Sequence, residues 1–75
     1  MNNKRRQQLR EWVRSAEDVK SQLELILSDE EEYFDMMPEN LQGSMNGMNS
    51  EEAIDQMNEA IACIEEAIDT VEEIV

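Results

Sequence analysis

A seven-residue repeat of apolar positions runs through the second half of the chain. Residues 51–71 read EEAIDQM, NEAIACI and EEAIDTV, and a fourth copy begins EEIV. The repeat forms three apolar columns: Ile54, Ile61, Ile68 and Val75; Met57, Ile64 and Val71; and Ala53, Ala60, Ala67 and Ile74. This spacing places all three columns on one face of a helix. We expect that helix to run from about residue 50 to 74, with Asn49 or Ser50 as its N-cap.

The first half predicts a second long helix, from about residue 3 to 34. Its apolar columns are Leu9, Ala16 and Leu23, and then Trp12, Val19 and Ile26, with Val13 and Leu27 beside them. Residues with high helix propensity dominate this segment, and neither Gly nor Pro interrupts it. The helix must end before Pro38, because the residue before a proline is biased away from helical conformation.

The predicted connector, residues 35–49, reads DMMPENLQGSMNGMN and is long for a link between two helices. Pro38 and the three residues after it suit one short helical turn with Pro at its first position. Gly43 and Gly47 allow chain reversal. The four methionines of the connector favour an ordered segment that packs over the open end of the helix pair, anchored by Tyr33 and Phe34. The alternative is an adaptable, Met-rich binding surface.

These elements predict an all-α fold, an antiparallel two-helix hairpin that resembles a coiled coil. A 75-residue chain is marginal as a folded monomer. Three apolar columns suit a helix that touches more than one neighbour. We therefore expect a homo-oligomer, a dimer or higher, with two hairpins forming a four-helix bundle as the simplest arrangement. Its expected core is Ile54, Met57, Ile61, Ile64, Ile68 and Val71.

Charge is distributed very unevenly along the chain. The net charge is -13, yet all six cations lie in the first 20 residues, which carry +3 while the remainder carries -16. The antiparallel fold sets the basic start of the first helix beside the acidic end of the second. The expected ion pairs join Arg10 and Arg14 to Glu72 and Glu73, and Lys20 to Glu65 and Glu66. So acidic a chain repels nucleic acid and anionic membranes directly, and attracts basic partners.

The residue inventory argues against catalysis and against metal or cofactor binding. The chain has no His and one Cys, which excludes a disulfide framework and the usual zinc sites. The acidic run 29–32 with Asp35 lacks the alternating ligands and central Gly of an EF-hand loop, so we expect a solvated surface. Cys63 fits a reducing compartment. No segment resembles a membrane span or a signal peptide, so we expect a cytosolic protein. The residue inventory as a whole predicts that the protein is not an enzyme.

Two sets of residues are candidates for binding a partner. Arg5, Arg6 and Arg10 could hold the phosphates of a nucleotide whose ring stacks on Trp12, although Trp12 also suits the core. The second set surrounds the connector and suits a protein partner. It comprises Tyr33, Phe34, Met37, Pro38, Asn40 and Leu41.

Four segments carry a resemblance to a known group of proteins. They are KRR at residues 4–6, EEEYFD at 30–35, MPENLQGS at 37–44 and EEAI at 51–54. In this pattern the chain resembles short, acidic, uncharacterised helical proteins of phages and prophages of Gram-positive bacteria. Such proteins usually carry ERYE or a similar sequence after the Ser, where this chain has MNGM at residues 45–48.

The resemblance implies a phage setting, in which small proteins often counter host defence. We therefore expect a non-catalytic accessory protein that binds and inhibits or sequesters a host factor, a protein in the first instance. Two alternatives remain open: an oligomeric sponge for a nucleotide immune signal, and a structural oligomerisation module.

Overall fold

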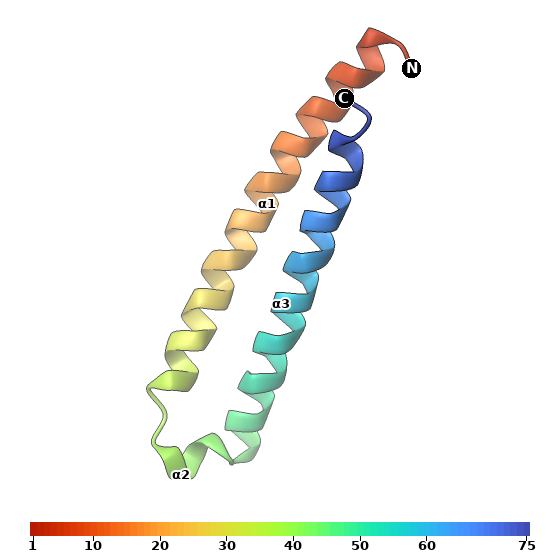
Figure 1. Ribbon diagram of the computed structural model, residues 1–75. Coiled ribbons are helices and arrows are strands. Elements are labelled where there is room, and N and C mark those ends of the chain that lie inside the picture. The colour runs from red at the N-terminus through yellow and green to blue at the C-terminus, as the bar shows by residue number, and fades with distance from the viewer.

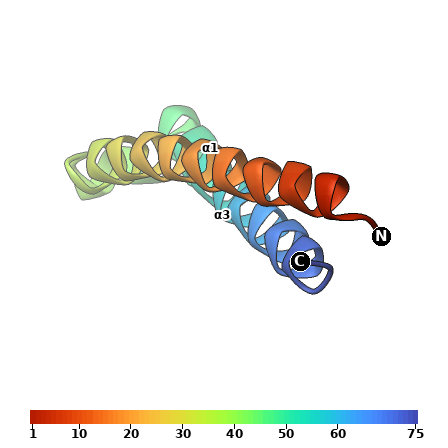
Figure 2. The ribbon, with the colours of Figure 1, turned by 90° about the horizontal axis from the view of Figure 1, so that it is seen from above.

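Two long helices lie side by side in opposite directions in the computed structural model, which describes all residues 1–75 (Figure 1). Helix α1 spans Asn3–Asp35, the short α2 spans Glu39–Gln42, and α3 spans Met45–Glu72. The molecule is a rod of 58 × 15 × 13 Å between Cα atoms, with both termini at one end. Viewed from above, the two long helices cross at a shallow angle, as paired helices commonly do (Figure 2). The expected all-α hairpin is confirmed.

Helix α1 has a side-chain cap at its start and a proline shortly after its end. The Asn2 Oδ1 atom accepts a hydrogen bond from the Arg5 backbone N–H at 2.8 Å, which satisfies one of the free donors of the first turn. The helix ends at Asp35, and Pro38 follows soon after, where continued helix is sterically disfavoured. The sequence placed this end one residue earlier, at residue 34.

The connector contains the expected helical turn. Pro38 is the N-cap of α2 rather than its first helical residue, and its carbonyl accepts the Leu41 N–H at 2.8 Å. The Gln42 side-chain amide donates to the carbonyl oxygens of Phe34 and Met37, both at 3.3 Å. The first bond joins α2 to the last turn of α1 and the second joins it to the link between the two helices, so hydrogen bonds hold the reversal of the chain.

The expected start of the second helix near residue 50 is wrong, because α3 begins at Met45. Its N-cap is Ser44, whose Oγ accepts the Gly47 N–H at 3.3 Å. Asn49 and Ser50 therefore lie inside the helix, and the connector shrinks from residues 35–49 to residues 36–44. The error arose because Gly47 suggested a turn, whereas a capped first turn accommodates a glycine.

Neither glycine uses the conformational freedom expected of it, since no residue has a positive φ angle. Gly47 matters for its size. A Cβ at this position would collide with the Gln42 carbonyl group and lie 2.7 Å from the Leu41 carbonyl oxygen. Gly43, by contrast, has nothing within 4 Å of the place its Cβ would take. Gly47 thus allows α2 to pack directly on the first turn of α3.

The two long helices meet along a seam of positions spaced alternately by three and four residues, the heptad pattern of a coiled coil. In α1 the seam comprises Leu9, Val13, Ala16, Lys20, Leu23, Leu27, Glu30 and Phe34, and in α3 it comprises Ser50, Ile54, Met57, Ile61, Ile64, Ile68 and Val71. All of these are buried or half-buried. One expected ion pair, Lys20 to Glu65 at 3.5 Å, joins the two helices in this register, whereas Arg10 and Arg14 form none.

The predicted second column of α1 lies outside the seam. Trp12, Val19 and Ile26 are largely exposed, and Val13 and Leu27 face α3 instead. Each helix carries an apolar face wider than one neighbour can cover, so the column next to the seam stays in solvent. The same holds for Ala60 and Ala67 of α3 and for Ile74 just after it, which are also exposed, whereas Ala53 of that column is half-buried.

Adding a methyl group at Gly47 should destabilise the hairpin. We expect Gly47→Ala to lower the free energy of unfolding by about 1–3 kcal/mol, because the new Cβ meets rigid backbone. Gly43→Ala is the matched control and should leave stability unchanged or slightly raised. Urea unfolding followed by circular dichroism measures both. Equal stability of the two variants would contradict the close packing of α2 on α3.

A charge placed in the seam should be far more damaging than the same charge beside it. Ile61 is buried, so Ile61→Asp should cost about 3 kcal/mol or more, through an unpaired carboxylate in an apolar environment. Ala62→Asp changes the adjacent, exposed residue and should cost well under 1 kcal/mol. Melting temperatures of the two variants test this, and similar values would mean that the seam is placed on the wrong face.

Candidate partner-binding surfaces

One side of the hairpin carries an apolar stripe contributed by both long helices. We define the apolar stripe as Trp12, Val19, Ile26 and Tyr33 of α1 with Ala60 and Ala67 of α3 and with Ile74, which follows the end of α3. Each of these residues except Ile74 directly precedes a seam position, and Ile74 continues the column of Ala60 and Ala67 at the same seven-residue spacing. In an antiparallel helix pair such positions of the two helices lie on the same side. The four large α1 side chains are 44–58 % exposed, so the stripe is an uncovered apolar surface.

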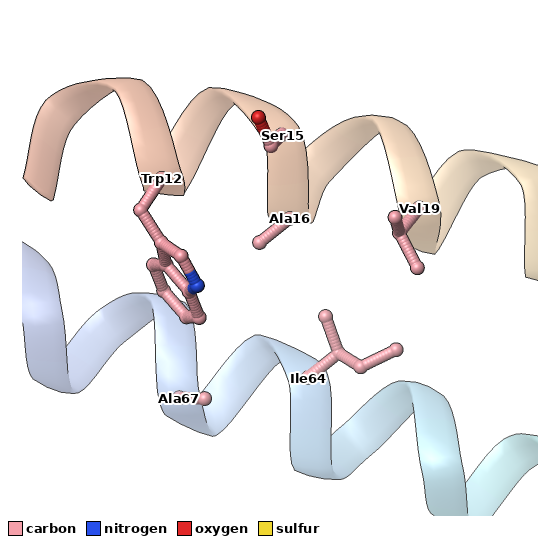
Figure 3. Close-up of a pocket in the computed structure, with 6 residues that line it drawn as sticks. All are labelled: Trp12, Ser15, Ala16, Val19, Ile64 and Ala67. Carbon is pink, nitrogen blue, oxygen red and sulfur yellow. The ribbon is translucent and has the colours of Figure 1, made fainter. Parts of the chain in front are cut away.

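A groove lies where this stripe meets the seam (Figure 3). It is lined by Trp12, Ser15, Ala16, Val19, Ile64 and Ala67, and its volume is about 300 Å³. The Trp12 ring reaches from α1 across toward α3, and Ile64 points back toward α1. Two small residues, Ala16 and Ala67, leave the space between them open. Trp12 is therefore neither fully in the core nor free in solvent, but forms one wall of an apolar groove.

The positions flanking the stripe carry almost no charge. They are Gln8, Ser15, Gln22 and Asp29 on α1, and Gln56, Cys63 and Thr70 on α3. Asp29 is the one charged side chain among them. The carboxylates of α3 all occupy other positions of the heptad. A chain of net charge -13 thus has one long side from which charge is almost excluded.

A second exposed apolar surface lies at the closed end of the hairpin. We call Met36, Leu41, Met45 and Met48 the methionine tip; they are 48–77 % exposed. The expected packing of the methionines over the end of the helix pair is therefore wrong for these residues; among the methionines of the connector only Met37 is half-buried, as is Phe34. The Gln42 amide closes this end through its two hydrogen bonds, which leaves the methionines outside.

Carboxylates surround the methionine tip. Met45 and Met48 line a shallow, open hollow on α3 together with Asn49, Glu51, Glu52 and Asp55. Asp35 and Glu39, on the two elements before α3, are also exposed. Flexible apolar side chains beside negative charge attract a ligand that is both apolar and cationic.

The structure does not gather the proposed nucleotide-binding residues on one face. Arg5 and Trp12 share a column of α1, but Arg10 projects roughly 200° away from Trp12 around the helix axis. Arg6 continues the line of the seam where the first turns of α1 extend past the end of α3 (Figure 1). The arginines therefore form a basic end of the rod rather than a pocket.

The other predicted site residues divide between the seam and the tip. The six expected oligomer-core residues, Ile54 to Val71, all face α1 within the chain. Tyr33 belongs to the apolar stripe, and Pro38 and Asn40 are exposed on the connector. Sequence reasoning missed Val19 and Ile26 as surface residues and Gln42 as a structural one. The heptad register of α1, with Val13 and Leu27 in the seam, was the signal that would have placed the first two outside.

The side chains of these surfaces can contact a partner through apolar packing and through charge. No three His, Cys, Asp or Glu side chains come together in a way that could hold a metal ion. Cys63 is exposed and unpaired. None of the helices combines the length and the apolar character that crossing a bilayer requires. Comparisons with protein-family models, with curated proteins and with solved structures find no match to this chain.

Proposed function

We propose that this protein is a non-catalytic phage accessory protein that binds a host protein through the methionine tip and thereby inhibits or sequesters it. The observation that carries the proposal is the exposure of Met36, Leu41, Met45 and Met48 at one end of the rod. Contiguous apolar surface on a small protein marks an interaction site. The phage setting and the host cytosol as its location are supported by the resemblance in residues 30–44.

The surroundings of the tip define the chemistry of the partner. Methionine side chains are unbranched and adapt to partners of different shape. The carboxylates of Glu51, Glu52 and Asp55 beside Met45 and Met48 favour a basic segment. The partner surface we propose is therefore a basic amphipathic helix, which would place its apolar face on the methionines and its cations toward the rim.

The protein acts as a homo-oligomer in this proposal. Support comes from how little of a single chain is buried. Only five residues are buried, and the apolar ones among them are Leu27, Ile61 and Ile68. A core of this size is small for a stable monomer, and association supplies further burial.

Substitutions in the methionine tip should specifically weaken binding of the host protein. Met45→Ser with Met48→Ser should weaken host-protein binding at least about tenfold, because two large apolar contacts are removed. Leu25→Ser is the matched control, since Leu25 is 69 % exposed but lies on α1 away from the tip. Tagged wild-type protein and both variants are incubated with host extract, and retained proteins are quantified by mass spectrometry. Calorimetry on the purified pair then gives the affinities.

The same experiment separates the alternatives. A host protein retained equally by all three forms would place the site elsewhere on the rod. A nucleotide found in place of a protein would favour the sponge function, with Arg5, Arg6, Arg10 and Trp12 as its residues. If the purified protein carries neither, the structural oligomerisation module becomes the better explanation.

A further inference from the structure

We infer that the apolar stripe is the contact surface for a second copy of this chain, which binds antiparallel to the first about a two-fold axis. The inference deepens the homo-oligomer of the proposed function and rests on it. It assigns which surface associates, in which orientation, and which side chains meet.

The stripe matches itself when one copy is turned around. Its α1 members are spaced by seven residues, with Trp12 and Tyr33 at the ends and Val19 and Ile26 in the middle. A two-fold axis between Val19 and Ile26 brings these two residues together and sets Trp12 against Tyr33 of the second copy. Such a contact is isologous, because each residue pair occurs twice. It pairs aromatic with aromatic and aliphatic with aliphatic.

The groove offers space for side chains of the second copy. It lies between Trp12 and Val19, so in the antiparallel arrangement it faces the stretch from Ile26 to Tyr33 of the second copy. Side chains from that stretch would enter the space left by Ala16 and Ala67. On α3 the small residues of the stripe, Ala60 and Ala67, allow the second hairpin to come close.

The charge distribution favours the stripe side as the contact between two copies, and it favours their antiparallel orientation. Two chains of net charge -13 repel each other, and the stripe side is the one where the flanking residues are nearly all uncharged. The charge changes sign along α1, with Lys4, Arg5 and Arg6 at its start and Asp35 at its end, followed by Glu39. The antiparallel arrangement puts the basic end of each copy beside the acidic end of the other. A parallel arrangement would put like charges together at both ends.

The dimer leaves the proposed partner surface accessible. Met45 and Met48 occupy heptad positions of α3 on the outer side of the hairpin, away from the stripe. The hollow that they line with Glu51, Glu52 and Asp55 would thus remain open once at each end of the dimer. One dimer could then engage two partner molecules.

The first test measures association. Wild-type protein at micromolar concentration should sediment as a dimer in analytical ultracentrifugation. Ile26→Glu should raise the dimer dissociation constant at least about a hundredfold, because two carboxylates would be buried at the two-fold contact. Leu25→Glu adds the same charge to a neighbouring, equally apolar and more exposed residue on the outer side of α1, and should remain dimeric. Circular dichroism at the same concentrations reports whether each variant is helical.

The outcomes distinguish a failure of the stripe as the contact surface from a failure of the proposed homo-oligomer. A wild-type monomer would overturn the homo-oligomer itself. A dimer that Ile26→Glu and Leu25→Glu weaken equally, or not at all, would overturn the stripe as the contact surface and leave the homo-oligomer standing. Loss of host-protein binding in the tip variant, with the dimer intact, would show that the two surfaces are independent.

The second test measures the relative orientation of the two copies in a protein whose stripe residues are unchanged. Gln8→Cys, in a Cys63→Ser background, carries a spin label near the basic end of α1. In the antiparallel dimer the two labelled backbones should lie roughly 40–45 Å apart, from the 1.5 Å rise of a helix. In a parallel dimer they would lie side by side. Pulsed electron paramagnetic resonance gives the distance, and a short one would overturn the antiparallel arrangement.

Discussion

The width of the apolar face on each long helix is the constraint on which the rest of this structure depends. A helix in contact with one neighbour covers two columns of its heptad, yet both helices here carry three apolar columns. The hairpin covers the two columns that mesh and leaves the third in solvent on each helix. Because the helices are antiparallel, the two uncovered columns lie on the same side. A folded single chain therefore retains one apolar side, which a further helix pair can cover.

Charge follows the same division of the helix surface. The carboxylates of α3 lie on outer positions of the heptad, away from the stripe, and all six cations lie in the first 20 residues, whose first turns extend past the end of α3. The one ion pair, between Lys20 and Glu65, is partly exposed and contributes at most about 1 kcal/mol. Its significance is the alignment of the two helices. The charge pattern thus bears more on which molecules can approach, and from which side, than on the stability of the hairpin.

The closed end shows how a small number of backbone contacts creates an exposed surface. Gly47 lets α2 approach the first turn of α3, and the Gln42 amide attaches α2 to the end of α1. With the end of the hairpin closed by polar contacts, the methionines are not needed to cover it. They remain available for a partner, surrounded by carboxylates that share the same short elements.

The sequence by itself determined the hairpin. The heptad repeat, the uninterrupted first helix and Pro38 predicted two helices, a reversal and the Lys20–Glu65 alignment, because each depends on local periodicity or on chain geometry. The tertiary structure alone decided which apolar columns are covered. Trp12 and Val13 are adjacent and both apolar, and only the angle at which α3 packs on α1 determines that Val13 lies in the seam and Trp12 beside it. It also decided that Gly47 is a contact and that the methionines stay outside, since both depend on how α2 packs against its neighbours, which helical periodicity does not specify.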